Sequence, residues 1–107
     1  MEIKQYHIII VNLDPTIGRE IQKTRPCVVI SPNEMNKFLR TIIVAPITSK
    51  TKNYPTRIKF NLEGNENWIA IDQLRTIDTT RIVQIIGKLE QKDIRKLKAI
   101  IKETFID

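Results

Sequence analysis

The sequence predicts a mainly β fold of the α+β class: an antiparallel barrel or strongly twisted sheet that ends in one α-helix. Short runs of β-branched residues alternate with turn residues along most of the chain. The hydrophobic spacing becomes helical only near the end. The length of 107 residues and the 41% hydrophobic content suit one domain, which we expect to span residues 1–107.

Six runs rich in valine, isoleucine, threonine and aromatic residues are expected to form strands. They cover residues 6–13, 27–31, 41–47, 56–62, 68–71 and 81–89. Turn residues separate several of them, at positions 14–18, 31–33 and 63–65. The polar connections 14–24 and 50–55 are longer than hairpin turns, and loops of this kind often carry functional residues.

The segment Gln91–Phe105 is expected to form the single helix. Ile94, Leu97, Ile101 and Phe105 recur at steps of three and four, and lysines occupy most of the positions between them. This spacing predicts an amphipathic helix with one packed stripe, which we interpret as part of the core rather than a cofactor or coiled-coil surface.

The net charge of +6 is unevenly distributed along the chain. Residues 15–59 contain nine basic and two acidic residues, a local charge of +7. Such an excess attracts polyanions, among which nucleic acid is the first candidate; a merely solvated basic surface is the alternative. No apolar run approaches the roughly 20 residues that a membrane span needs, and residues 1–6 lack a signal-peptide pattern. We therefore expect a cytoplasmic protein without membrane contact.

The chain has one cysteine and one histidine, which is too few for an ordinary zinc site. Cys27 lies in an apolar run and is expected to be a small buried residue. His7 lies in a β-type run and is expected to be a strand residue rather than a base. The carboxylates do not form the cluster that a two-metal nuclease needs, and three scattered glycines do not make a phosphate-binding loop. We expect no metal and no cofactor.

Arginine, hydroxyl, amide and carboxylate groups remain, and they suit cleavage of RNA by its own 2′-hydroxyl. Because the substrate supplies the nucleophile, the protein has only to align it, stabilise the charge on the phosphorane-like transition state and move two protons. Arg25 precedes Pro26, which favours an extended backbone at Arg25, and its planar guanidinium can bind two phosphate oxygens. Thr48 follows the expected strand 41–47 and precedes a basic loop, so its hydroxyl could donate to the same phosphate. Neither motif is specific alone.

Taken in order, four blocks of the sequence resemble the MazF/PemK/Kid family of toxins. The blocks are residues 14–31, residues 44–49, residues 72–78 followed by Arg81, and residues 87–89 with the terminal helix. The resemblance covers nearly the whole chain. It implies an SH3-like barrel with a C-terminal helix, usually as a homodimer.

The resemblance also implies an activity. Members of this kind are sequence-specific, metal-independent endoribonucleases of single-stranded RNA, in particular mRNA. They leave 2′,3′-cyclic phosphate and 5′-hydroxyl ends and inhibit translation and growth. A cognate, MazE-like antitoxin neutralises them, and we expect it to be an acidic, flexible partner of the basic RNA groove.

The same resemblance assigns site residues. The catalytic arginine falls on Arg25 and the catalytic threonine on Thr48, with Glu20 as a candidate general base. The expected RNA-binding residues are Arg19, Lys23, Asn33, Asn36, Ser49, Lys50, Lys52, Gln73 and Arg75.

One departure from the family pattern narrows this assignment. The Kid branch uses an arginine two residues before the aspartate of the third block, together with that aspartate and a histidine. Here Ala70 stands two residues before Asp72, and His7 does not match that histidine. We therefore favour the Arg25–Thr48 arrangement and expect Asp72 to be structural, holding the turn at residues 73–75.

Two other functions remain open from the sequence. A gyrase-poisoning toxin on the same fold would need a partner-binding, typically tryptophan-containing C-terminus, whereas the single Trp68 is internal. A non-catalytic nucleic-acid-binding barrel would explain the charge but not the blocks around Arg25 and Thr48.

Overall fold

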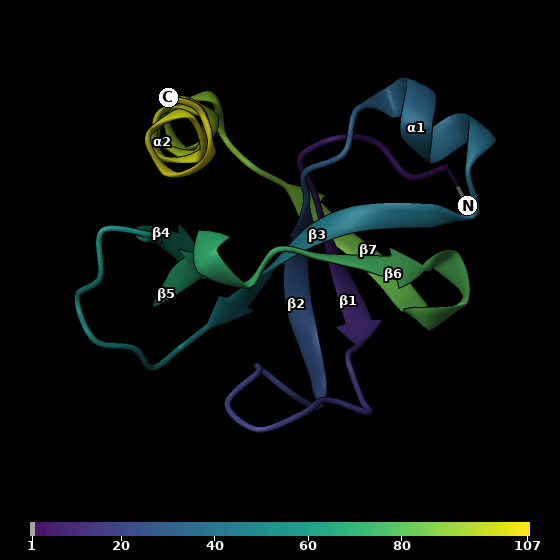
Figure 1. The fold of residues 1–107 in the computed structure, drawn as a ribbon, viewed down its shortest axis with the longest axis horizontal. Helices are drawn as coiled ribbons and strands as arrows, with labels where there is room; N and C mark the ends of the chain where they lie inside the picture. Colours follow the sequence, from purple (N-terminus) through teal and green to yellow (C-terminus); the bar gives the residue numbers. More distant parts are fainter. Residues whose placement is uncertain (1) are drawn as a thin grey trace.

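A computed structural model describes residues 2–107. Within these residues the chain forms seven strands, two α-helices and two short 3-10 turns, arranged as Figure 1 shows. The strands are β1 (His7–Asn12), β2 (Thr24–Val29), β3 (Thr41–Thr48), β4 (Arg57–Leu62), β5 (Asn65–Ala70), β6 (Arg75–Asp78) and β7 (Ile82–Lys88). The helices are α1 (Asn33–Phe38) and α2 (Gln91–Phe105), and the 3-10 turns are η1 (Ile71–Gln73) and η2 (Thr79–Arg81).

The strand β3 is the element around which the antiparallel sheet curls. Its first half pairs with β6, its middle with β2 and its last two residues with β5. The strand order is β4-β5-β3-β2-β1-β7, with β6 joined to β3. Because three partners share one eight-residue strand, the sheet closes into a half-barrel. The predicted mainly β fold, a twisted sheet or barrel with a C-terminal helix, is confirmed.

Two hydrophobic cores occupy opposite faces of this curled sheet. In β1, Ile8 packs into the core that also contains Leu97 of α2, whereas the next residue, Ile9, packs into the core that contains Cys27 and Val44. Consecutive side chains of a strand point to opposite faces. The uninterrupted apolar run in β1 is therefore explained by burial on both faces.

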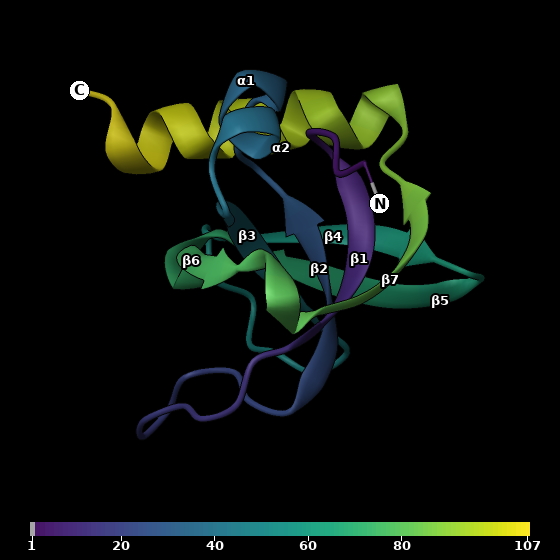
Figure 2. The same ribbon diagram turned by 90° about the vertical axis from the view of Figure 1, so that its right-hand side faces the viewer.

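The helix α2 begins and ends where the sequence predicts, and its N-terminal half is packed. Ile94 and Leu97 are buried, and Ile101 packs partly against the same core. The prediction that Phe105 belongs to the packed stripe is wrong, because this side chain is 53% exposed. The C-terminal end of the helix extends beyond the strands, so no sheet lies beneath it (Figure 2).

Three features differ from the sequence prediction. The connection at 31–33 is followed by the helix α1, whose six residues are too few to show a helical period. The short strand β6 (Arg75–Asp78) was not predicted, because its four residues contain only one buried side chain. The strand β2 begins at Thr24 rather than at Cys27, since its first residues pair with the end of β1.

The β4–β5 hairpin turns at Glu63 and Gly64, as the sequence predicts. Both residues have positive φ angles, 51° and 84°, which suit a two-residue turn of this handedness. The turn sets the register, so that Leu62 faces Asn65. The same register places Arg57 opposite Ala70 at the far end of the hairpin.

Candidate active site

The candidate site lies where β2 begins and β3 ends. The two strands pair antiparallel, with Cys27 opposite Pro46 as the last recorded pair. Beyond this pair the two strands take other partners, since Thr48 pairs with Trp68 of β5 and Arg25 pairs with Val11 of β1. Side chains alternate along a strand, so Arg25 shares a face with Cys27, and Thr48 shares a face with Pro46. Cross-strand partners point to the same face of a sheet. Both side chains therefore continue the face that buries Cys27, at the point where the core ends.

Thr48 is almost buried, and its hydroxyl is engaged locally. The residue is 9% exposed. Its Oγ1 donates to the carbonyl oxygen of Lys50 at 3.0 Å and accepts from the backbone N–H of Lys50 at 3.3 Å. This short turn fixes the hydroxyl at the end of β3. Ser49 and Lys50 follow it directly and are exposed, at the start of the polar loop 49–56.

Arg25 is half-buried and retains most of its donor capacity. Its Nε donates to the carbonyl oxygen of Gln22 at 3.1 Å. This contact is made within the loop that leads into β2. A guanidinium has five N–H donors, and this is the one side-chain hydrogen bond recorded for Arg25 among the described residues 2–107. The remaining donors suit an anionic ligand with several oxygens, such as a phosphate.

The two long loops lie at the end of the sheet away from α1 and α2 (Figures 1 and 2). Residues of the third sequence block hold the loop 14–24. Gln73 accepts the backbone N–H of Ile21 on its Oε1 at 2.7 Å, and Arg75 donates from Nη1 to the carbonyl oxygen of Leu13 at 3.1 Å. These two predicted RNA-binding residues therefore anchor the loop in this structure.

The start of the same loop is held by further contacts. Arg81 donates from Nη1 to the carbonyl oxygen of Asp14 at 2.7 Å, and the Asp14 carboxylate accepts the backbone N–H of Lys23 at 2.9 Å. Lys23 has a φ of 71°, a left-handed conformation that this hydrogen bond helps to hold. The Lys23 side chain is exposed, as the predicted role in binding RNA requires.

A cavity of about 390 Å³ lies between the loop 14–24 and the third block. Four of the predicted site residues line it, namely Arg19, Glu20, Gln73 and Arg75, together with Pro46 of β3. The Glu20 carboxylate accepts the backbone N–H of Ile17 at 2.6 Å, so it closes a tight turn within the loop. The structure thus brings these four residues together near the end of β3.

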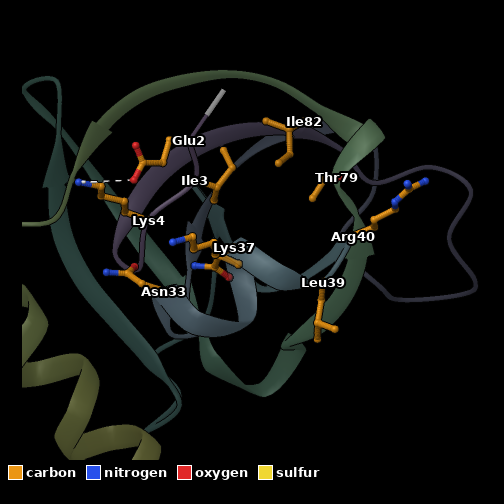
Figure 3. Close-up of a pocket in the computed structure, with 10 residues that line it drawn as sticks. Glu2, Ile3, Lys4, Asn33, Lys37, Leu39, Arg40, Thr79 and Ile82 are labelled. Atoms are coloured by element: carbon orange, nitrogen blue, oxygen red, sulfur yellow. Dashed lines mark ion pairs between the residues drawn. The ribbon is translucent and has the colours of Figure 1, made fainter.

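Asn33 and Asn36 lie elsewhere, in a second cavity of about 940 Å³ beside α1 (Figure 3). Asn33 accepts the backbone N–H of Gln5 at 2.8 Å. Asn36 donates to the carbonyl oxygen of Ser31 at 2.9 Å and accepts the Ser31 hydroxyl. Within this chain, the two asparagines are not brought together with Arg25 and Thr48.

A second arginine, which the sequence pattern did not reveal, lies near the site. Arg57 donates from Nε and Nη2 to the two carboxylate oxygens of Asp72, at 2.7 and 2.9 Å. Its Nη1 donates to the Thr51 hydroxyl at 2.8 Å, and the Thr56 hydroxyl donates to Asp72 at 2.9 Å. The hydrogen bonds from Arg57 lower the pKa of Asp72, and those to Asp72 raise the pKa of Arg57.

The expectation that Asp72 is structural fits this contact, although its partner is Arg57 rather than the turn at 73–75. In the sequence, Ala70 stands where the Kid pattern has an arginine two residues before Asp72. The register of the β4–β5 hairpin places Arg57 opposite Ala70, so the arginine comes from the neighbouring strand. The Glu63-Gly64 turn was the signal that could have revealed this pair, because it sets the register.

The remaining titratable groups that the sequence analysis weighed have structural roles. His7 accepts the backbone N–H of Lys4 on its Nδ1 at 3.0 Å, and burial lowers its pKa. Cys27 is fully buried, which raises the pKa of its thiol to about 12. Within residues 2–107, no three histidine, cysteine or acidic residues gather as a metal site would require. None of the helices described is long and apolar enough to cross a membrane.

Comparison with known families gives a match over most of the chain. Residues 4–105 match the family described as the PemK-like, MazF-like toxin of type II toxin–antitoxin systems. The chain is similar to the endoribonuclease EndoA of Bacillus subtilis, with 29% identity over 91% of this chain and 89% of the relative. It is also similar to the endoribonuclease PemK of Escherichia coli, with 35% identity over 72% of this chain and 62% of the relative.

Solved structures show the same fold. MazF from Deinococcus radiodurans superposes with a TM-score of 0.85 at 21% identity, covering 96% of both chains. An endoribonuclease from a mycobacterial species, solved with its cognate antitoxin, superposes with a TM-score of 0.80 at 12% identity, covering 94% of this chain and 92% of that one. At these identities the likeness concerns the fold.

Proposed function

The chain belongs to the PemK-like, MazF-like family of type II toxins, and from this premise we propose that it is a sequence-specific endoribonuclease toxin that cleaves single-stranded RNA, chiefly mRNA, without a metal ion. Such cleavage would inhibit translation and growth. The observation that supports the proposal is that Arg25 and Thr48 each stand two residues beyond Cys27–Pro46, the last β2–β3 pair, where strand alternation gives both side chains the same face.

In the proposed reaction, the 2′-oxygen of one nucleotide attacks the adjacent phosphorus while the 5′-oxygen of the next nucleotide leaves. The products are a 2′,3′-cyclic phosphate and a 5′-hydroxyl. Arg25 stabilises the charge that builds up on the phosphorane oxygens and protonates the leaving oxygen, and the Thr48 hydroxyl donates to the same phosphate. No step needs an activated water molecule.

The proton on the attacking 2′-hydroxyl needs an acceptor. A free arginine, with a pKa above about 12, is a poor base. Glu20 is the proposed base, but its carboxylate is bonded to the Ile17 N–H in this structure. This bond occupies one carboxylate oxygen, so the second oxygen of Glu20 is the one proposed to accept the proton.

The two loops supply the proposed RNA contacts around this centre. Arg19 and Lys23 are exposed in the loop 14–24, and Ser49, Lys50 and Lys52 are exposed in the loop 49–56. Cations of this kind neutralise backbone phosphates. Gln73 and Arg75 line the cavity beneath the first loop and are proposed to meet a base there. Asn33 and Asn36 stay a prediction for RNA contact, from the separate cavity beside α1.

An acidic, MazE-like antitoxin and a second copy of the chain are the proposed protein partners. The net charge of +6 favours an acidic segment that folds on binding. Structural relatives include a MazE–MazF complex and an endoribonuclease bound to its cognate antitoxin. The strand β7 lies at the edge of the sheet, and an edge strand offers unpaired backbone groups with which a second copy can pair. Sedimentation at micromolar concentration tests the dimer.

We place the protein in the cytoplasm, with its substrate.

Incubation of the pure protein with a long RNA in the presence of a chelator tests the proposed activity. We expect cleavage at a short recurring sequence, with 5′-hydroxyl ends. A single 2′-deoxy substitution at the cleaved nucleotide should abolish cleavage there, whereas the same substitution two nucleotides away should not. Intact RNA would favour a gyrase poison or a non-catalytic RNA-binding barrel, and cleavage that the chelator abolishes would exclude the proposed chemistry.

A further inference from the structure

We propose that Arg57 and Asp72 are positioning residues of the RNA site, which hold the loop 49–56 beside Thr48 and connect it through η1 to the loop 14–24. We call Thr51, Arg57 and Asp72 the Arg57 brace. The role in RNA binding rests on the proposed function. The ordering of the two loops does not, because it can be measured without RNA.

Arg57 holds the middle of the loop that follows Thr48. Its Nη1 donates to the Thr51 hydroxyl, and its guanidinium carbon lies 5.6 Å from the centre of the Tyr54 ring. The other recorded hydrogen bonds of residues 50–54 join near neighbours, such as the Tyr54 N–H to the carbonyl oxygen of Lys52. The backbone N–H of Arg57 also donates to the carbonyl oxygen of Tyr54 at 3.0 Å. Among the described residues, Nη1 of Arg57 therefore adds the one side-chain hydrogen bond that links residues 51–54 to the strand β4.

Asp72 is the fixed end of the brace. Both of its carboxylate oxygens accept from Arg57, in the two-point geometry that an arginine and a carboxylate favour. The Arg57 side chain is only 11% exposed, so it is shielded from competing water and salt. These contacts lower the pKa of Asp72, which keeps the carboxylate charged throughout the neutral range.

The 3-10 turn η1 connects the brace to the other loop. Asp72 and Gln73 are consecutive residues of this turn. Asp72 holds the loop 49–56 through Arg57, and Gln73 holds the loop 14–24 through the backbone N–H of Ile21 at 2.7 Å. A displacement of η1 therefore disturbs both loops, which carry the exposed cations proposed to bind RNA.

The bonding of Arg57 distinguishes it from Arg25. Three donor nitrogens of Arg57 are committed to protein oxygens, and its side chain is nearly buried. Arg25 makes one hydrogen bond to a loop carbonyl. Arg57 is therefore suited to holding the loop in place, whereas Arg25 is suited to meeting the phosphate.

Hydrogen exchange of the protein without RNA tests the brace directly. In Arg57→Gln and Asp72→Asn, we expect the hydrogen-bonded amides of Lys50, Tyr54 and Ile21 to exchange about tenfold faster, because the loops open locally. Thr51→Val should affect residues 50–54 alone. The matched control is Lys59→Gln, which also removes a cation of β4 but breaks an exposed ion pair with β5, Lys59 to Glu66 at 3.1 Å, and should leave both loops unchanged.

Unchanged exchange in a folded Arg57→Gln protein would overturn the proposal. If Arg57→Gln does not fold, Thr51→Val and Arg57→Lys carry the same test. A lysine can meet one oxygen of Asp72 but cannot also reach Thr51 in the planar arrangement of a guanidinium. We therefore expect Arg57→Lys to show an intermediate increase in exchange.

Steady-state cleavage separates positioning from catalysis. Arg57→Gln should raise KM about tenfold and change kcat by less than about threefold, and the double variant with Asp72→Asn should be no worse, since both substitutions remove one interaction. An unchanged KM, or a loss of kcat as large as that of Arg25→Ala, would contradict a positioning role. If the parental protein does not cleave RNA, the proposed function fails, while the exchange result still decides whether the brace orders the loops.

Discussion

The two ends of the β2–β3 ladder use their polar side chains differently. Where β2 ends and α1 begins, Asn36 and Ser31 bond to each other, and the Ser31 hydroxyl also accepts the backbone N–H of Ile43 at 3.0 Å. Where β2 begins and β3 ends, Arg25 donates only to a loop carbonyl, and Thr48 bonds only to the turn that follows it. At the first end, the polar side chains bond to one another and to the backbone. At the second end, the guanidinium of Arg25 has further N–H donors that a ligand could use.

The difference follows from where the core stops. Val29 and Val44 pair inside the core formed by one face of the sheet. Toward α1, the chain has to turn back from β2 to β3, and buried backbone groups there need partners. Toward the loops, the two strands separate into polar connections. There the Arg25 side chain is half-exposed and donates from Nε to the carbonyl oxygen of Gln22, which leaves its other N–H groups available.

The largest expected effect comes from removing the Arg25 guanidinium. Loss of one donor to a developing oxyanion typically costs about 10² to 10³ in rate. We expect Arg25→Ala to lose at least that much in kcat for RNA cleavage, without a change in melting temperature. Stopped or quenched cleavage of a short RNA measures the rate, and circular dichroism checks the fold. A folded variant that cleaves RNA at the parental rate would contradict the catalytic role proposed for Arg25 at this end of the ladder.

At the α1 end, substitution should change stability instead. Asn36→Ala removes two hydrogen bonds to Ser31 and leaves a buried hydroxyl with fewer partners. We expect the free energy of unfolding to fall by about 1–3 kcal/mol. Urea denaturation measures this change. A rise in KM in the folded variant, without a loss of stability, would instead place Asn36 in contact with RNA.

The Arg57–Asp72 pair should give a small, pH-dependent effect. The pKa of Asp72 is lowered from its ordinary value of 3.8, so its contribution is complete above that value and is lost as the pH falls through the lowered pKa. Because the Asp72 side chain is 37% exposed, we expect no more than about 1 kcal/mol. The difference in melting temperature between the parental protein and Asp72→Asn should shrink from pH 7 toward pH 3. A difference that grows on acidification would contradict the ion pair.

The smallest effect is expected at Cys27, which lies two residues inside the core from Arg25. Burial raises the pKa of its thiol to about 12, so almost no thiolate exists at pH 8. A thiol reagent should react only when the protein is unfolded, and Cys27→Ala should cleave RNA at the parental rate. Rapid reaction in the folded protein would show that the Cys27 thiol is accessible to solvent, which would contradict its burial in the core.

The helix α2 and the β4–β5 hairpin could be predicted because each has a clear pattern within a short stretch of sequence. The period of Gln91–Phe105 indicated α2, and Glu63-Gly64 indicated the β4–β5 hairpin. The helix α1 and the strand β6 (Arg75–Asp78) were missed because each is short and takes its stability from contacts that are distant in sequence. The strand β6, for example, is defined by its pairing with β3.

The site was predicted unevenly for the same reason. Arg25 and Thr48 could be chosen from residue chemistry and family resemblance, because each stands in a recognisable block. The ion pair of Arg57 and Asp72 joins residues fifteen positions apart and depends on the hairpin register. The roles of Gln73 and Arg75 as anchors of the loop depend on contacts that span 52 and 62 residues, which no local pattern contains.

A double-mutant cycle between Arg25 and Thr48 tests the central claim, that these two side chains act together on one phosphate. We predict that Arg25→Ala and Thr48→Ala each reduce kcat/KM for RNA cleavage in chelator, by about 10² or more. The double variant should lose little beyond the worse single variant, since groups that act as a unit are not additive. Two folded single variants that cleave RNA at the parental rate, or a double loss equal to the product of the single losses, would contradict the account.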